Sequence, residues 1–324
     1  MLSEGSIIMI KKELLLIICA FVTAATLSAG YVDTIKSRVF IKYNDPGRFL
    51  FALNGGGSMN LPSVHGGYAK PQVFAAATLR PFSRLAIDVK AQHQFNQFWK
   101  NQDLKDTRSF EASASMYLTQ KTLRKLKVFT AGSKKYNYDF FTPVKVRWNT
   151  GIIAGFNKGS DVANSGLDEH SGLSFTNEET GVTELKERIA VPFAYEEVSA
   201  GFVVSTSSRF KIDVTLPDGK IKTRRMKTYT QFSIQAVYGT KYDMVSSISV
   251  RENPRSNVAT PYTVNPGKIN PWGFKLAGSF SRKLITLKVE TGLKPGIHQR
   301  FSGVENASVA DRSYMSIGVG IGWM

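Results

Sequence analysis

Apolar and polar residues alternate one by one over many short stretches of this chain. The clearest stretch is 85–98, whose apolar positions are Leu85, Ile87, Val89, Ala91 and Phe95 and whose polar positions are Asp88, Lys90, Gln92, Gln94 and Asn96. A period of two is that of a β-strand with one apolar face and one polar face. The stretch therefore predicts a strand that separates an apolar environment from an aqueous one.

The same alternation predicts thirteen strands along the chain. They are residues 49–59, 68–80, 85–98, 108–118, 125–138, 145–157, 198–204, 210–216, 227–238, 244–251, 272–280, 285–291 and 313–323. Short turns are expected near residues 82, 121, 207, 240 and 282, and longer connections near 62, 103, 141, 221, 260 and 303. Bacterial outer-membrane barrels alternate short periplasmic turns with long external loops in this way.

The expected fold class is all-β, in the form of a transmembrane antiparallel up-and-down β-barrel. The alternation of sides fails only across residues 158–192, so a further strand is expected at 166–175 or 183–191. Fourteen strands is then the predicted number, and twelve is the next candidate. A secreted soluble β-sandwich is the alternative fold, and it would not require short and long connections to alternate.

The N-terminus has the features of an export signal. The apolar run Leu14–Leu27 follows Lys11 and Lys12 and precedes small residues. It is shorter than the roughly 20 residues of a transmembrane helix, but it suits a secretory signal peptide that begins at Met1 or at Met9. The expected organisation is a signal peptide over residues 1–30, a short periplasmic segment over 31–48 and a barrel in the cell outer membrane over 49–324.

The chain is strongly basic, with 42 Lys and Arg against 25 Asp and Glu and a net charge of +17. Such a balance favours anionic partners. For an exported barrel we expect these to be outer-membrane lipid, lipopolysaccharide and small solutes rather than nucleic acid. A basic cluster in a predicted external loop either contacts lipopolysaccharide phosphates or is simply solvated; it consists of Lys220, Lys222, Arg224, Arg225 and Lys227.

The C-terminal run Tyr314–Trp323 resembles the closing strand of outer-membrane β-barrel proteins, which typically ends in an aromatic residue used in barrel assembly. Here Met324 follows the aromatic residue. The resemblance implies that the barrel-assembly machinery recognises the strand that ends at Trp323. A looser similarity, in strand number and in segment 191–204, links the chain to the 14-stranded long-chain fatty acid transporter family. That family has an N-terminal hatch, for which residues 31–48 are too few, so we transfer neither its substrate nor its binding residues.

Alternate residues of the last predicted strand are glycines. Gly318, Gly320 and Gly322 share the face opposite Ile317, Val319 and Ile321. Their missing side chains leave room on the inner face for a loop or for the N-terminal segment. Equally, they allow the strand to curve.

The polar phase of the predicted strands gives the candidate lumen-lining residues. They are Asp88, Lys90, Glu111, Lys127, Lys145, Arg147, Lys211, Asp213, Lys275, Lys288 and Glu290. Seven are basic and four acidic, which predicts a passive pore or transporter for small solutes that prefers anions. Alternatively, the charges neutralise one another across the wall. The barrel is then closed, and it works through its outer loops, by binding a partner, or as a structural subunit of an envelope complex.

The sequence carries no motif of an enzyme or of a metal site. His-Glu-x-x-His, Gly-x-Ser-x-Gly and phosphate-loop patterns are all absent, and the apolar phases next to His93 offer no serine. Residues 168–187 are rich in acids but lack EF-hand spacing. We therefore expect no catalytic residues, no bound cofactor and no metal.

Overall fold

A computed structural model describes most of the chain from Arg38 onward. The described residues are 38–45, 51–62, 70–95, 106–132, 137–164, 173–184, 189–216, 219–250, 259–266, 269–282, 284–297 and 313–323. The predicted signal peptide over residues 1–30 lies outside these ranges. Within them, no helix is long and apolar enough to cross a membrane.

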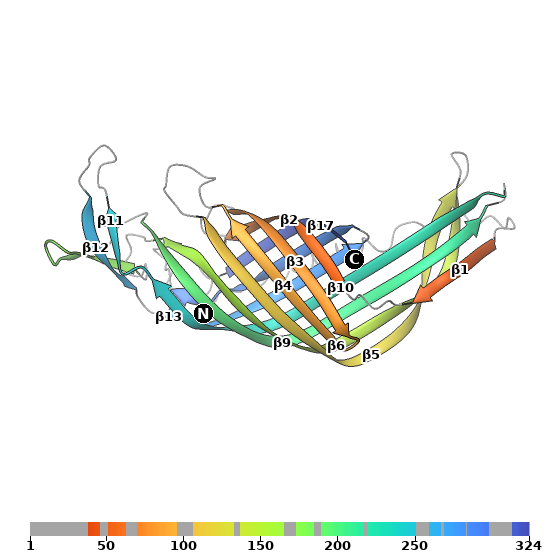
Figure 1. The fold of residues 1–324 in the computed structure, drawn as a ribbon, viewed down its shortest axis with the longest axis horizontal. Coiled ribbons are helices and arrows are strands. Elements are labelled where there is room, and N and C mark those ends of the chain that lie inside the picture. The colour runs from red at the N-terminus through yellow and green to blue at the C-terminus, as the bar shows by residue number, and fades with distance from the viewer. Residues whose placement is uncertain are drawn as a thin grey trace, which may run out of the picture. The chain divides into compact units, whose positions relative to one another are not determined.

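The described elements are all β-strands (Figure 1). The strands of the main sheet are β1 (Arg38–Asp45), β2 (Phe51–Pro62), β3 (Lys70–Phe82), β4 (Leu85–Gln94), β5 (Thr107–Gly132), β6 (Asn137–Asn164), β9 (Ala190–Thr215), β10 (Ile221–Met244), β14 (Trp272–Arg282), β15 (Ile285–Leu293) and β17 (Ser313–Trp323). Two smaller sheets consist of β7 (Leu173–Asn177), β8 (Thr183–Glu184), β11 (Ser247–Val250) and β12 (Thr260–Pro266), and of β13 (Ile269–Asn270) and β16 (Gly296–Ile297).

Ten strands of the main antiparallel sheet follow one another in a ring. The order is β9, β10, β14, β15, β17, β2, β3, β4, β5 and β6, and β6 pairs again with β9. The last strand, β17, pairs with β2 from Tyr314 opposite Pro62 to Trp323 opposite Leu53 (Figure 1). Strand β1 lies next to β9 as an eleventh strand. The fold is therefore all-β and barrel-like.

The chain divides into two compact units. We call the first the hairpin unit; its described parts fall within residues 38–42, 125–144 and 211–224. The second, the ring unit, comprises the remaining described residues, including the strand pairs that close the ring. Strands β5, β6, β9 and β10, of 24 to 28 residues each, run through both units.

Three turns predicted from the sequence are wrong. Residues 119–124 lie inside β5, residues 206–208 inside β9, and residues 239–242 inside β10. The first two predicted turns are polar but contain no glycine or proline, and their threonines are good strand formers. The polar residues there belong to strands that are exposed on both faces. In β5, nearly every residue from 118 to 126 is exposed.

These corrections change the number of strands. Residues 125–132 continue β5, residues 210–215 continue β9, and residues 247–250 form β11 in a separate sheet. The strand expected at 166–175 or 183–191 is likewise absent from the ring, because β7 and β8 pair outside it. The described ring thus has ten strands, and the predicted fourteen are not confirmed.

Connections of the ring alternate in length, but not at all of the positions that the sequence predicted. The long connections expected near residues 141 and 221 are wrong, because the chain turns there over the short segments 133–136 and 216–220. The connections 83–84, 133–136, 216–220 and 283–284 are short, whereas 63–69, 95–106, 165–189, 245–271 and 294–312 are long. In an antiparallel ring, successive connections fall at opposite ends. All short connections therefore belong to one end and all long ones to the other, as in outer-membrane barrels.

The ring has exposed apolar side chains on its outer side, and its inward positions are largely polar beside a small buried cluster of Ala86, Tyr117, Ile153 and Val203. In β17, Ile317, Val319 and Ile321 are 38%, 57% and 73% exposed, whereas the glycines between them are covered. In β10, Phe232 and Ile234 are about half exposed, while the intervening Ser233 is buried. This distribution is the reverse of that in a soluble domain and matches a wall with lipid on its outer side.

Candidate functional site

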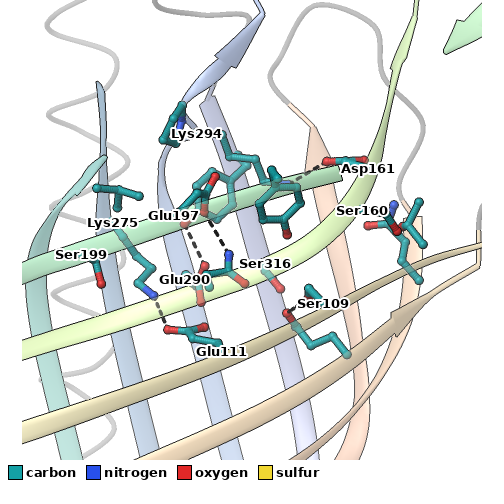
Figure 2. Close-up of a pocket in the computed structure, with 18 of the residues that line it drawn as sticks. Ser109, Glu111, Ser160, Asp161, Glu197, Ser199, Lys275, Glu290, Lys294 and Ser316 are labelled. Atoms are coloured by element: carbon teal, nitrogen blue, oxygen red, sulfur yellow. Dashed lines mark hydrogen bonds and ion pairs between the residues drawn. The ribbon is translucent and has the colours of Figure 1, made fainter. Parts of the chain in front are cut away.

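Inward-facing side chains of the ring unit line two adjoining polar cavities, which share six residues. Figure 2 shows one of them. Their volumes are about 100 Å³ and about 150 Å³. Both are lined by Lys90, Gln92, Glu111, Lys275, Glu290 and Ser316. They form the interior of the ring and are the candidate functional site.

Six of the predicted lumen-lining residues do line these cavities. They are Asp88, Lys90, Glu111, Lys275, Lys288 and Glu290. Three are basic and three acidic, so the basic excess that favoured anions in the sequence is absent from this set. Counting all lining residues gives six bases and five acids. Charge in the described interior is nearly balanced.

Ion pairs cross the interior between strands that are not neighbours. Lys275 of β14 donates a hydrogen bond to Glu111 of β5 (Figure 2). Lys90 of β4 lies 3.5 Å from Glu290 of β15. At least three strands of the ring separate the members of each pair in either direction. Each pair therefore crosses the lumen and does not lie along one side of it.

Near the long connections, the interior contains five polar residues that the sequence analysis missed. Lys294, just after β15, lies 3.2 Å from Asp161 of β6 (Figure 2). The amide of Asn157 donates to Glu197 at 3.0 Å, and Tyr314 donates to Glu290 at 2.8 Å. Glu197 comes directly before the predicted strand 198–204 and points to the face opposite to that of Val198. Starting this strand one residue earlier would have identified Glu197 as a lumen-facing residue.

Toward the short connections, the interior is spanned by an arginine between two tyrosines. Arg80 of β3 donates to the hydroxyls of Tyr117 and Tyr229 at 2.9 Å and 2.8 Å. Its guanidinium lies 5.1 Å and 4.8 Å from the centres of their rings. Because β3, β5 and β10 supply these residues and Arg80 is 7% exposed, the three side chains obstruct the lumen. The sequence analysis placed Arg80 at a turn and missed this cluster.

The space above the glycines of β17 is filled by an aromatic ring. A Cβ atom built at Gly318 or Gly320 would come within 3.2 Å of the ring of Phe74 in β3. Lys288 lies 4.9 Å from the centre of the same ring. The glycines thus admit Phe74, and the loop or N-terminal segment that the sequence analysis considered lies largely outside the described residues.

The other five predicted lumen residues do not line the cavities. They are Lys127, Lys145, Arg147, Lys211 and Asp213. Lys145 is exposed between the buried Val144 and Val146, so the phase predicted for this part of β6 is wrong. A change of phase occurs before Trp148, which is exposed.

Asp213 belongs to a small polar cluster of the hairpin unit. Lys42 of β1 lies 2.8 Å from its carboxylate, and the hydroxyl of Thr223 in β10 donates to it at 2.7 Å. These two hydrogen bonds hold the pKa of Asp213 below its usual value. The carboxylate therefore links β1 to the hairpin of β9 and β10.

The basic cluster predicted for an external loop lies on a strand. Lys220 ends the tight connection between β9 and β10, in which Gly219 has a φ of 79°. The other four basic residues are part of β10 itself. The predicted loop position is wrong because the turn signal Pro217–Gly219 is followed directly by strand residues. Whether the cluster contacts lipopolysaccharide stays a prediction.

Within the described ranges, no three His, Cys, Asp or Glu side chains are close enough together to hold a metal ion. Outside the lumen, His93 and Asp106 form a pair at 3.2 Å. The interior offers paired charges and hydrogen bonds rather than a nucleophile with a general base. That the protein is not an enzyme and binds no cofactor stays a prediction.

No protein-family model and no curated protein matches the chain. Solved structures of outer-membrane proteins share a distant likeness with it. OmpT of Vibrio cholerae is 11% identical, with 87% of this chain and 99% of that one covered and a TM-score of 0.19. OmpF of Salmonella typhi, in a complex with daunomycin, is 5% identical, with coverage of 89% and 98% and a TM-score of 0.22. Such low scores carry no argument about function, and the fold rests on the strand pairing described above.

Proposed function

We propose that the protein is a bacterial outer-membrane β-barrel with a closed lumen that acts through its ends, by binding a partner or as a structural part of an envelope complex. The observation that carries this proposal is the set of ion pairs across the lumen, above all that between Lys275 and Glu111. An open pore has no such bridges in its water path. Barrels of about 8 strands are filled by side chains, whereas those of 16–18 strands leave a channel. A ring of ten is close to the filled case.

Strand lengths and exposed apolar residues support the membrane location. Strands β4, β14, β15 and β17 have 10, 11, 9 and 11 residues, and about 9–11 residues suffice for a tilted strand to cross a bilayer. The C-terminal strand closes the ring against β2, which supports its proposed recognition by the barrel-assembly machinery through Trp323. The proposed signal peptide would direct export.

The orientation follows from the connections. With short connections in the periplasm and long ones outside, the basic cluster next to the connection 216–220 is periplasmic. We therefore do not propose lipopolysaccharide as its partner. Lipid and lipopolysaccharide are then partners of the exposed apolar belt and of the end with the long connections.

A narrow pore for small solutes is the second candidate function. It is favoured by the polar residues that the two cavities share, since these form a continuous polar lining. The near balance of charge gives this pore no preference for anions.

Conductance in planar lipid bilayers tests the proposal. We expect the wild-type protein to leave the membrane sealed at high protein load, and the variant Lys275→Ala/Glu111→Ala to give conductance steps because its lumen has lost a bridge. The matched control is Lys241→Ala/Asp243→Ala, an exposed pair with a 2.7 Å contact that does not line the cavities. Stable steps from the wild type would refute the closed barrel in favour of the pore. Partitioning into the aqueous phase without detergent would refute the membrane location.

A further inference from the structure

In the hairpin unit, strands β5 and β10 each have an edge without a neighbouring strand. Pairing of β4 with β5 ends at Leu85 opposite Met116, and pairing of β10 with β14 begins at Thr228 opposite Arg282. Beyond these points, the sheet order gives β5 only β6, and β10 only β9, among the described strands. A strand edge of this kind offers backbone N–H and C=O groups to another extended chain.

The two edges lie within reach of one side chain. The guanidinium of Arg224 in β10 donates a hydrogen bond to the backbone carbonyl of Thr130 in β5 at 2.9 Å. A side chain thus takes the place at β5 that a backbone donor of an added strand would take. An incoming carboxylate could accept from Arg224 and leave this carbonyl to the added strand.

The hairpin unit carries most of its charge as cations. Its described side chains include seven bases: Lys42, Lys125, Lys127, Lys211, Lys220, Lys222 and Arg224. They include two acids, Asp139 and Asp213, each of which already accepts hydrogen bonds within the unit. In contrast to the balanced lumen, this surface is complementary to an anionic partner.

Large apolar side chains lie between the basic ones on both strands. Leu126 and Val128 of β5 are 66% and 45% exposed, and Ile221 of β10 is 65% exposed. An alternating pattern of cations and aliphatic groups suits a strand that carries acidic and apolar residues in alternation, because added strands gain affinity from the backbone and specificity from alternate side chains.

We propose that the edges of β5 and β10 in the hairpin unit bind an extended acidic polypeptide segment of a partner protein as an added strand. The binding surface, here called the edge patch, consists of Lys125, Leu126, Lys127 and Val128 with Ile221, Lys222 and Arg224. This site goes beyond the closed barrel and holds whether or not the lumen conducts. The other use of lysines on a strand edge is protection against aggregation, which predicts no binding.

Fluorescence anisotropy of a labelled decapeptide of alternating Glu and Val, titrated with the full-length protein in a neutral detergent, tests the edge patch. We expect saturable binding that weakens as salt is added. Lys125→Glu/Lys222→Glu should lower the affinity at least about tenfold, which corresponds to ~1.4 kcal/mol. The control Lys158→Glu/Lys241→Glu changes two exposed lysines of the ring unit and should leave the affinity unchanged.

Two further probes separate strand addition from general attraction between charges. The same decapeptide with N-methylated valines keeps its charge but loses backbone donors, so it should not bind; equal binding would overturn the proposal. Failure of the unmethylated peptide to bind would assign the lysines a protective role. Micelles containing phosphatidylglycerol should not displace the peptide, and complete displacement would identify the patch as a lipid-headgroup site instead.

Discussion

Removing Lys275 tests whether the ion pairs of the lumen are buried and essential to the closed barrel. The variant Lys275→Met keeps the length of the side chain but leaves the carboxylate of Glu111 without its partner across the ring. Lys275 also lies in the field of Glu290 and Glu197. Its loss therefore leaves an excess of negative charge in the interior of the ring.

The expected cost follows from the burial of the pair. Breaking a buried ion pair by removing one partner costs about 3–5 kcal/mol, because an uncompensated charge remains. The side chains of Lys275 and Glu111 are 10% and 21% exposed. Some water can therefore reach the carboxylate, so we expect a loss near the lower limit, about 3 kcal/mol. Removing both charges in Lys275→Met/Glu111→Leu should restore stability to within about 1 kcal/mol of wild type, since apolar replacement of a whole buried pair is often neutral.

The assay is equilibrium unfolding in urea of the protein in detergent micelles. Tryptophan fluorescence and the migration of unheated samples in denaturing gels report the folded fraction. The decisive comparison is between the single and the double variant. If Lys275→Met unfolds at the same urea concentration as wild type, or if the double variant is as unstable as the single one, the lumen is filled with water and the argument for a closed barrel fails.

Three other perturbations address different parts of the fold. In Gly201→Ala, the new Cβ would clash with the carbonyl oxygen of Ile234. We expect the free energy of unfolding to fall by about 1–3 kcal/mol in the same assay. In the control Gly57→Ala, the nearest atom to the new Cβ is 3.8 Å away, so the free energy of unfolding should not change. Because hydrogen bonds lower the pKa of Asp213, the carboxylate stabilises the fold at neutral pH, and this contribution is lost as the pH falls through the lowered pKa. The difference in stability between wild type and Asp213→Asn should therefore shrink only at acidic pH, below the usual pKa of an aspartate, and a difference independent of pH would contradict this role. In Phe175→Ala, the fully buried ring of the small sheet is lost; a protease specific for glutamate should then cut within residues 173–184, which contain three glutamates, while the barrel stays heat-modifiable in gels. Unchanged protection would show that the small sheet has no separate core.

Alternation of residues was enough to locate the walls of the ring. Stretches such as 85–98 and 313–323 must be apolar on one face and polar on the other over their whole length, so the pattern is complete in the sequence, and β4 and β17 are found where it occurs. The lengths of the connections were predicted correctly only where they flank such strands, as at 83–84 and 283–284. Residues 119–124 were predicted as a turn, although they lie inside β5, because a strand that is exposed on both faces has the amino-acid composition of a turn.

The contacts inside the lumen depend on which strands face each other. Lys275 and Glu111 are 164 residues apart, and their pairing requires the number and order of the strands in the ring. A list of inward-facing positions therefore contains both residues but not the bond between them. Arg80 was missed for a related reason, since its partners Tyr117 and Tyr229 come from strands that are not adjacent to β3.

The bridges across the lumen also constrain the order of events during assembly. Entry of Lys275 or Glu111 into an apolar bilayer without its partner is energetically unfavourable. The two side chains become neighbours only when β5 and β14 face each other. The ring in turn closes through β17, the last described strand, against β2, the first strand of the ring in chain order. A half-inserted intermediate would hold isolated charges in lipid, so folding and insertion should occur as one late, cooperative step that waits for the C-terminus. Its rate should therefore respond to substitutions in β17 more strongly than to substitutions in the long connections.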